Sequence, residues 1–406
     1  MSVVAIDATP GVSAGLVERV RARLVASGSH ASALDVTAAL RDEGVVLADL
    51  GLLEVVRLVR DELVGAGALE PVLRDSAVTD VLVNGPREVW VDRGDGLQPV
   101  AVDLTDEASV RRLAQRLAAA AGRRLDDASP YVDARLRDGT RLHAVLPPIS
   151  PTGTVISLRV PRRVSFSLED LIERRTVTKA AAQLLVALVS SRTSFIISGG
   201  TGSGKTTILS TLLGVVDPRE RVLILEDCVE LRPAHPHLVR LETRPPNVEG
   251  AGAVDLRDLV RQALRMRPDR IVVGEVRGAE VVDLLAALNT GHDGGATTVH
   301  ANSAADVPAR LEALALSAGL SREGLHSQLR AALRVVVHVA RDHDGVRRVE
   351  GLHVFTADAR DRVSVEVAAR FPTDGALVKG PAWSSLCDVL TAGVHPGADV
   401  VPVACS

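Results

Sequence analysis

Residues 194–214 read SFIISGGTGSGKTTILSTLLG, and this stretch decides the fold. A short apolar strand leads directly into GGTGSGKTT, residues 199–207, which fits the GxxxxGKT pattern of a phosphate-binding loop and opens a helix. The glycines let the backbone curl so that its N–H groups point at phosphate oxygens, and the helix amino terminus adds partial positive charge. An ordinary glycine-rich turn would share the letters but not this context. The stretch therefore predicts a nucleotide-binding P-loop domain.

Side chains of this loop have separate expected roles. Lys205 is expected to reach the β- and γ-phosphates and the Thr206 hydroxyl to ligate Mg²⁺, so ATP is the predicted substrate and Mg²⁺ the predicted cofactor. The chain has only three lysines, Lys179, Lys205 and Lys379, so a lysine inside the phosphate-binding pattern stands out. The residues expected to bind the nucleotide are Gly199, Gly200, Thr201, Gly202, Ser203, Gly204, Lys205, Thr206 and Thr207.

Beyond the loop, short apolar strands alternate with amphipathic helices. The strands read RVLILED, RIVVGE and ATTVHA, and helices are predicted over about 205–215, 255–266 and 278–290. Alternation at this spacing indicates an α/β fold, in which a mostly parallel sheet carries helices on both faces.

One of these strands ends in an acid that suits hydrolysis. RPDRIVVGEVRG, residues 267–278, is typical of a Walker B element and places Glu275 where a base would orient the attacking water. Gly274 stands where many P-loop proteins have a metal-holding aspartate, so action of Glu275 through water stays open. A buried strand that ends in a solvated glutamate is the plainer alternative.

A second strand end is also acidic. RVLILEDCVEL, residues 221–231, places Glu226, Asp227 and Glu230 where ligands bind in open α/β sheets. Acids there can polarise water or hold Mg²⁺ through its waters, so Glu226 and Glu230 are candidate catalytic residues and Asp227 is a candidate metal ligand. Charged strand ends are often only solvated, so the pattern by itself is weak.

Histidines flank a third strand end in GHDGGATTVHANS, residues 291–303. His292 or His300 could donate a hydrogen bond to a γ-phosphate there. A single histidine is more often structural, so both interpretations stay open for each.

Outside the P-loop region the residue pattern changes. Apolar positions at helical spacing occupy residues 12–70, and short β-rich pieces such as VTDVLVNG, TRLHAVLPP and TVISLRV surround a helix predicted over 105–121. The predicted parts are a helical segment 1–64, an α+β domain 65–163, a linker 164–191, the P-loop domain 192–355, and a hairpin with a weakly ordered tail 356–406.

Composition argues against some functions. Lys+Arg of 47 against Asp+Glu of 51 gives a net charge of -4, and the aromatic residues are only four Phe, two Trp and one Tyr. Such a chain has neither a strong positive field nor a base-stacking platform, so no direct nucleic-acid binding is expected. Because no apolar run approaches about 18 residues and MSVVAIDATP lacks the order of a signal peptide, a cytoplasmic location is expected, with membrane association only through partners.

Together these elements resemble a known family. The loop at 199–207, EDCVEL, the run HLVRLETRPPNVEGAGAVDLRDLVRQALRMRPDRIVVGEVRG and NTGHDGGATTVHANS are similar to the Walker A, Asp box, Walker B and His box of secretion ATPases of type II, type IV and pilus systems. They most resemble the TadA/CpaF branch of tight-adherence (Flp) pili. Upstream, VTDVLVNGPREVWVD, SPYVDARLRDGTRLHAVLPP and SLRVPRR extend the resemblance to roughly residues 65–355.

The resemblance implies a RecA-like P-loop domain preceded by a PAS-like α+β domain and a small helical segment. It also implies a homo-hexamer, a nucleotide held between domains and neighbouring subunits, and an inner-membrane platform protein as partner. Arg141 and Arg159 match two family arginines that reach the nucleotide from the amino-terminal domain. A guanidinium there would meet the charge that develops on the transferred phosphoryl group, whereas surface ion pairing is the plainer alternative.

Hydrolysis would then drive domain rotation for pilin assembly or secretion. Two other functions stay open: a conjugation-type secretion ATPase, and a nucleotide-dependent assembly protein with little turnover. A pure switch would not need Glu226, Glu230 and Glu275 all intact, which favours an enzyme.

Overall fold

The chain forms two compact units, Met1–Arg163 and Val164–Ser406, each considered by itself. The computed structural model describes residues 16, 19–20, 22–24, 33–45, 49–63, 65–94, 96–136, 138–161, 165–244, 246, 251–291, 293–342 and 345–392. Within these residues, no helix combines the length and apolar character that crossing a membrane requires.

The first unit begins with helices that have a small core of their own. Helices α2 (Ala33–Asp42) and α3 (Asp49–Leu63) contribute the buried side chains of Val36, Leu40, Val55 and Val59 to it. The predicted helical character of this segment agrees with both helices.

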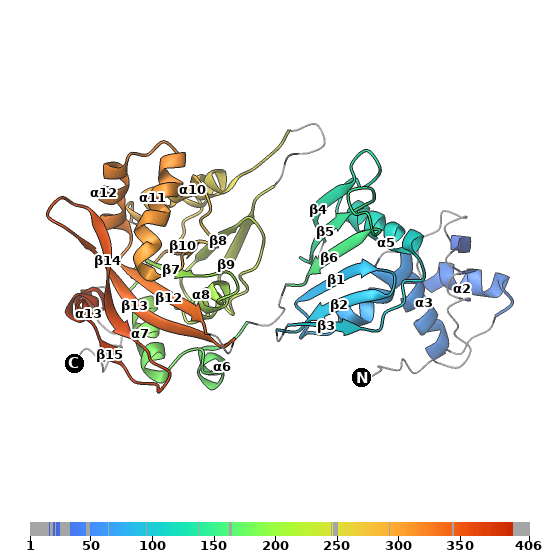
Figure 1. Ribbon diagram of the computed structural model, residues 1–406, viewed down its shortest axis with the longest axis horizontal. Coiled ribbons are helices and arrows are strands. Elements are labelled where there is room, and N and C mark those ends of the chain that lie inside the picture. Colours follow the sequence, from blue (N-terminus) through green and yellow to red (C-terminus); the bar gives the residue numbers. More distant parts are fainter. Residues whose placement is uncertain are drawn as a thin grey trace. The chain divides into compact units, whose positions relative to one another are not determined.

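A six-stranded antiparallel sheet follows in the first unit (Figure 1). Short helices η1 (Gly67–Leu69) and α4 (Glu70–Leu73) precede it. Its strands are β1 (Asp80–Gly85), β2 (Glu88–Asp92), β3 (Leu97–Val100), β4 (Tyr131–Arg135), β5 (Arg141–Val145) and β6 (Val155–Arg159), in the order β3-β2-β1-β6-β5-β4. In β1, β2, β4, β5 and β6 every second residue is buried in the core that includes helix α5 (Glu107–Ala120). The alternate residues form the opposite, open face, which mixes polar side chains with apolar ones such as Leu82 and Trp90.

The second unit is built on a nine-stranded sheet. Its strands are β7 (Phe195–Gly199), β8 (Val222–Glu226), β9 (Leu238–Glu242), β10 (Arg270–Val273), β11 (Ala296–His300), β12 (Val335–Arg341), β13 (Arg347–Ala357), β14 (Val363–Arg370) and β15 (Val378–Lys379). The order is β15-β14-β13-β12-β7-β11-β10-β8-β9, and pairing is parallel from β12 to β9 and antiparallel from β12 to β15. The predicted mostly parallel α/β sheet is confirmed.

Helices cover both faces of this sheet (Figure 1). The helices are α6 (Leu168–Glu173), α7 (Lys179–Ser190), α8 (Lys205–Gly214), α9 (Leu256–Ala263), α10 (Glu280–Leu288), η2 (Ala304–Asp306), α11 (Val307–Ser317), α12 (Arg322–Ala332) and α13 (Trp383–Ala392). Phe195 and Ile197 of β7 pack on one side with α7, α8 and α13, while Ile196 packs on the other with α9 to α12. Because both faces are covered, the central strands β7, β8 and β10 are buried at every position rather than at every second one.

Two expectations for this unit need correction. Residues 165–191, expected to be a linker, contribute α6 and α7 to the core, where Leu184, Leu185 and Leu188 are fully buried. The hairpin expected within residues 356–406 is present as β13 and β14, but it begins at Arg347 and extends the main sheet, and Leu386 and Leu390 of α13 are buried in the same core. Residues 393–406 of the expected tail lie outside the described part of the chain.

Candidate active site

The phosphate-binding loop lies between β7 and α8, as the sequence predicts. Gly202 and Gly204 have positive φ angles of 71° and 100°, which glycine adopts without the steric cost that a Cβ imposes. At Gly199 an added Cβ would lie 2.2 Å from the Val339 carbonyl oxygen of β12, so this position also excludes a side chain. The loop then opens α8 directly, and the unpaired N–H groups of its first turn border the loop.

Lys205, the first residue of α8, is held inside the loop. Its Nζ donates to the carbonyl oxygens of Gly199 (3.0 Å) and Gly200 (2.9 Å) and to Nδ1 of His300 (3.2 Å). The residue is only 6% exposed, and this burial lowers the pKa of Lys205 although the Glu275 charge opposes the effect. Lys205 is therefore hydrogen-bonded to the backbone of the loop and is also in contact with His300, the last residue of β11.

The ends of β10 and β11 meet beside this lysine. Nε2 of His300 is 2.7 Å from Oε1 of Glu275, and the Arg277 guanidinium pairs with Oε2 of the same carboxylate at 2.8 Å. Burial and then the Lys205 charge lower the pKa of His300, so the imidazole is neutral near pH 7. Because a lysine can only donate, Nδ1 of His300 accepts and the ring hydrogen is assigned to Nε2. The close approach of Nε2 to Glu275 is not a hydrogen bond in this geometry, since Oε1 has no hydrogen-bond partner among the described residues. Lys205, His300 and Glu275 form a continuous chain of contacts.

The end of β8 supplies the second acidic group. Glu226 is 4% exposed, and its Oε1 accepts hydrogen bonds from the backbone N–H groups of Glu230 and Leu231, both at 2.9 Å. Burial raises the pKa of Glu226 to about 7. Glu230 lies close enough for its charge to act on Lys205, together with that of Glu275. Both predicted strand-end acids of the Asp box are thus close to the loop, but in different environments.

The candidate metal-binding residues suit a metal ion that binds together with the nucleotide phosphates. Among the described residues, no group of three or more His, Cys, Asp or Glu side chains could hold a metal ion. Thr206 lies in the first turn of α8, and burial followed by the Glu280 charge raises the pKa of Asp227. Mg²⁺ commonly takes only one or two protein ligands and completes its shell with phosphate oxygens and waters, so these residues fit it in that manner.

An arginine from β13 also contacts the loop, and no sequence motif predicted this contact. Nε of Arg347 donates to the Gly202 carbonyl oxygen at 2.9 Å, and its Cδ lies 3.3 Å from where a Cβ on Gly204 would be. Arg347 follows the loop by 145 residues, so only the pairing of β12 with both β7 and β13 brings it there.

The two arginines expected from the amino-terminal domain lie on the open face of the first unit's sheet. Arg141 of β5 is paired in register with Arg159 of β6 on one side and Arg135 of β4 on the other. The nearest carboxylate recorded for Arg141 is that of Asp133, at 3.8 Å. Arg135, Arg141 and Arg159 thus form a row of like charges, which we call the arginine row. Arg135 was missed, although its spacing from Arg141 across a short turn could have suggested a hairpin pair.

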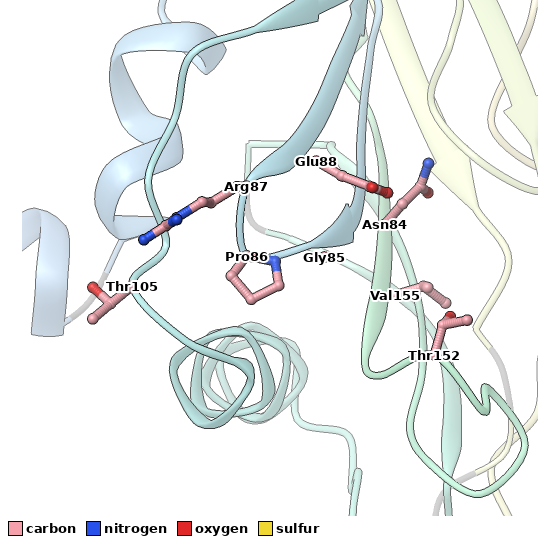
Figure 2. Close-up of a pocket in the computed structure, with 8 residues that line it drawn as sticks. All are labelled: Asn84, Gly85, Pro86, Arg87, Glu88, Thr105, Thr152 and Val155. Atoms are coloured by element: carbon pink, nitrogen blue, oxygen red, sulfur yellow. The ribbon is translucent and has the colours of Figure 1, made fainter.

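The first unit also has a cavity of about 720 Å³ at the turn between β1 and β2 (Figure 2). In Figure 2 the Arg87 side chain extends on the side of Thr105, and Asn84 and Glu88 lie on the other side of Pro86. No residue of the P-loop or the arginine row lines it. The residues that line the cavity all belong to the first unit.

Comparison with known proteins identifies the family. Residues 62–370 match the family described as type II/IV secretion system protein. A Mycobacterium tuberculosis protein provisionally named as a conjugal transfer protein is 56% identical over 315 residues, covering 76% of this chain and 90% of that protein. This chain belongs to the type II/IV secretion system protein family.

A second relative agrees with this family, and a solved structure agrees with the fold. The conjugal transfer protein TrbB of Rhizobium radiobacter is 33% identical over 307 residues, 74% of this chain and 90% of TrbB. The crystal structure of the pilus retraction motor PilT with bound ADP has a TM-score of 0.51 at 19% identity, covering 70% of this chain and 80% of PilT. The PilT likeness concerns the fold, an amino-terminal antiparallel sheet domain followed by a RecA-like domain.

Within this secretion ATPase family, the structure brings together most of the residues that the sequence singled out. The loop residues, Glu226, Glu230, Glu275 and His300 converge on one edge of the second unit's sheet. His292 lies outside the described residues. Arg141 and Arg159 lie in the first unit, and the resemblance to TadA/CpaF is a finer assignment than the family match provides.

Proposed function

We propose that this chain hydrolyses Mg²⁺-ATP to drive a secretion machine of the conjugation-like, type IV class. The observation that carries the hydrolytic part is the chain of contacts from Lys205 through His300 to Glu275. It places the His300 imidazole between a phosphate-binding cation, Lys205, and a water-orienting carboxylate, Glu275. The three residues lie at or beyond the ends of three neighbouring parallel strands, β7, β11 and β10.

Each residue of the site would then have a distinct role. Lys205, the loop N–H groups and the α8 amino terminus would bind the phosphates, while Glu275 and Glu230 would orient the attacking water and accept its proton. Neutral His300 would hold Lys205 and Glu275 apart. When His300 moves away from Glu275, its ring N–H could donate a hydrogen bond to the γ-phosphate. Thr206, with Asp227 acting through water, would hold Mg²⁺, which neutralises phosphate charge when bound.

The arginine row would complete the site from the amino-terminal domain. Arg141 and Arg159 are paired in register on one sheet face, and like charges directly opposite are destabilising, so an anion bound there would stabilise that face. A triphosphate is such an anion, and fixed guanidinium donors suit the charge that develops during phosphoryl transfer. Closure of the two domains on ATP would then link nucleotide state to domain rotation, which is the mechanical output.

The class of machine is inferred from the relatives. The Mycobacterium and Rhizobium proteins are both named for conjugal transfer, which favours the conjugation-like assignment over the pilus assignment. Assembly of tight-adherence (Flp) pili is the second candidate, because the Asp box, His box and RLETRPPN segments resemble TadA/CpaF. In either machine the chain would work as a homo-hexamer in the cytoplasm, against an inner-membrane platform protein and without touching nucleic acid.

Glu275→Gln tests the hydrolytic part. With the full chain and Mg²⁺, the variant should bind ATP with nearly the parent's affinity but turn it over about 10²- to 10⁴-fold more slowly, because the amide keeps the shape and loses the base. The matched control is Glu173→Gln, an exposed acid at the end of α6, which should keep the parent rate. Parental turnover by Glu275→Gln would contradict the assignment.

Deleting the gene in its host separates the two machines. Loss of DNA transfer with normal surface pili would support the conjugation-like class, whereas loss of pili with normal transfer would establish the pilus role instead. Single-stranded DNA should leave the ATPase rate unchanged at physiological salt, because neither charge nor aromatic content favours binding.

A further inference from the structure

Glu226 is bonded to its own loop. The residue is the last of β8, and its Oε1 accepts the N–H groups of Glu230 and Leu231, so residues 227–231 curl back over the carboxylate. Both hydrogen bonds are 2.9 Å long and are accepted by a side chain that is only 4% exposed. Such a buried, doubly bonded oxygen fixes the path of the loop that carries Glu230.

The neighbouring strand leaves room for this arrangement. Gly274 follows β10, which pairs with β8, and a Cβ on Gly274 would lie 2.8 Å from Glu226 Cγ and 3.2 Å from Oε1. No real Cβ makes a carbon contact of 2.8 Å, so any side chain at position 274 would displace the Glu226 carboxyl group. The glycine in the place of a metal-holding aspartate therefore has a spatial role, which is to admit Glu226.

The acids of the site differ in what they face. The carboxylates whose charges act on Lys205 are Glu275 and Glu230, whereas the charged groups that act on Glu226 are Glu230 and Arg240. Glu230 spends only its backbone N–H on Glu226. The Glu230 charge acts on Lys205 of the P-loop, whereas the Glu226 carboxyl group accepts the backbone N–H groups of residues 230 and 231.

We propose that Glu226 is a positioning residue that anchors loop 227–231 so that Glu230 faces the nucleotide, and that Gly274 is the space which this anchor requires. The proposal deepens the proposed ATPase function and rests on it for the kinetic part. It separates two glutamates that the sequence pattern treats alike: Glu230 acts by its charge, and Glu226 acts by accepting two hydrogen bonds.

Glutamine substitutions separate charge from hydrogen bonding. In Glu226→Gln the amide oxygen can still accept both N–H groups, so kcat should fall by no more than about fivefold. Glu226→Ala removes the acceptor and Gly274→Ala displaces it. Both should lower kcat by about 10²-fold, the cost of misplacing a catalytic group by about 1 Å, with KM nearly constant. Glu230→Gln keeps the loop but loses the charge and should lower kcat by about 10²-fold or more.

A second measurement does not depend on activity. Hydrogen exchange of the full chain should show faster exchange of the Glu230 and Leu231 amides in Glu226→Ala and Gly274→Ala, but protection close to the parent's in Glu226→Gln and Glu230→Gln. Gly214→Ala is the matched control, because its added methyl group would meet nothing closer than 3.8 Å. It should preserve both exchange and turnover.

The outcomes are distinguishable. If Glu226→Gln loses turnover as severely as Glu230→Gln, the Glu226 charge takes part in the chemistry and the anchor role is wrong. Unchanged amide exchange in both Glu226→Ala and Gly274→Ala would also overturn it. If the parent itself hydrolyses no ATP, the proposed function fails, while the exchange pattern still decides whether Glu226 anchors the loop. Should Glu226→Ala not fold, Gly274→Ala carries the same test.

Discussion

The two sheets of this chain present their polar groups in different places. Helices cover both faces of the nine-stranded sheet, so its central strands β7, β8 and β10 are buried and largely apolar, and Glu226, Glu275 and His300 lie at or just beyond the ends of parallel strands. The six-stranded sheet packs one face against its core, and the arginine row lies across the middle of the other face. Lys205, His300 and Glu275 of the second unit contact one another at the strand ends, whereas Arg141 of the row has the Asp133 carboxylate at 3.8 Å.

The largest effect on ATP binding and turnover is expected at the strand ends of the nine-stranded sheet. Lys205→Ala should lower ATP affinity by about 10- to 100-fold, because a charged donor is lost. Turnover should fall by about 10³-fold, as when a buried donor to developing charge is removed. Binding is measured with a fluorescent nucleotide and turnover by phosphate release, with the exposed Lys179→Ala as control. Parental rates in Lys205→Ala would mean that the loop does not bind phosphate.

On the open face, binding and turnover should separate. The double variant Arg141→Ala with Arg159→Ala should leave ATP binding within about tenfold and lower turnover by about 10³-fold, the range of arginine fingers. The isolated piece 166–406 should likewise bind ATP and hardly hydrolyse it. If that piece turned over at the full-length rate, the open face would be no part of the site and the contrast between the two sheets would lose its functional meaning.

The smallest effect concerns stability against pH. Burial, then the charges of His338 and Arg370, lowers the pKa of His353 on β13 from 6.5 to about 4. A lowered histidine pKa favours the neutral folded state, so its stabilisation is complete above about pH 6.5 and is lost as pH falls toward 4, since only the unfolded chain takes up the proton. His338, whose charge acts on His353, is itself close to the Glu350 carboxylate.

His353→Gln should therefore flatten the dependence of the urea midpoint on pH between about 6.5 and 4, and His143→Gln, on the exposed face of β5, should leave it as in the parent. Equal slopes for the parent and His353→Gln would show that the covered sheet tolerates the charged form.

The positions of many candidate-site residues could be predicted from the sequence because parallel strands end on the same side of a sheet. GGTGSGKTT specifies its own backbone, and Glu226, Glu275 and His300 were expected near Lys205 as the last residues of neighbouring parallel strands or the ones that follow them. The linker expectation failed at KAAAQLLVALVS, where helix α7 is apolar on most sides and is buried between other elements. Sequence reasoning recognises a core helix by the periodic spacing of its apolar residues, and an almost uniformly apolar helix shows little of this periodicity.

The sequence by itself determined the P-loop, its lysine and the α/β class, because glycine spacing and the strand–helix alternation are local properties. Only the tertiary structure decided that Arg347 contacts Gly202, that Arg135 joins Arg141 and Arg159 in one row, and that Glu226 occupies the space beside Gly274. Each of these depends on which strands pair and in what register, and register is set by burial across the whole sheet rather than by neighbouring residues.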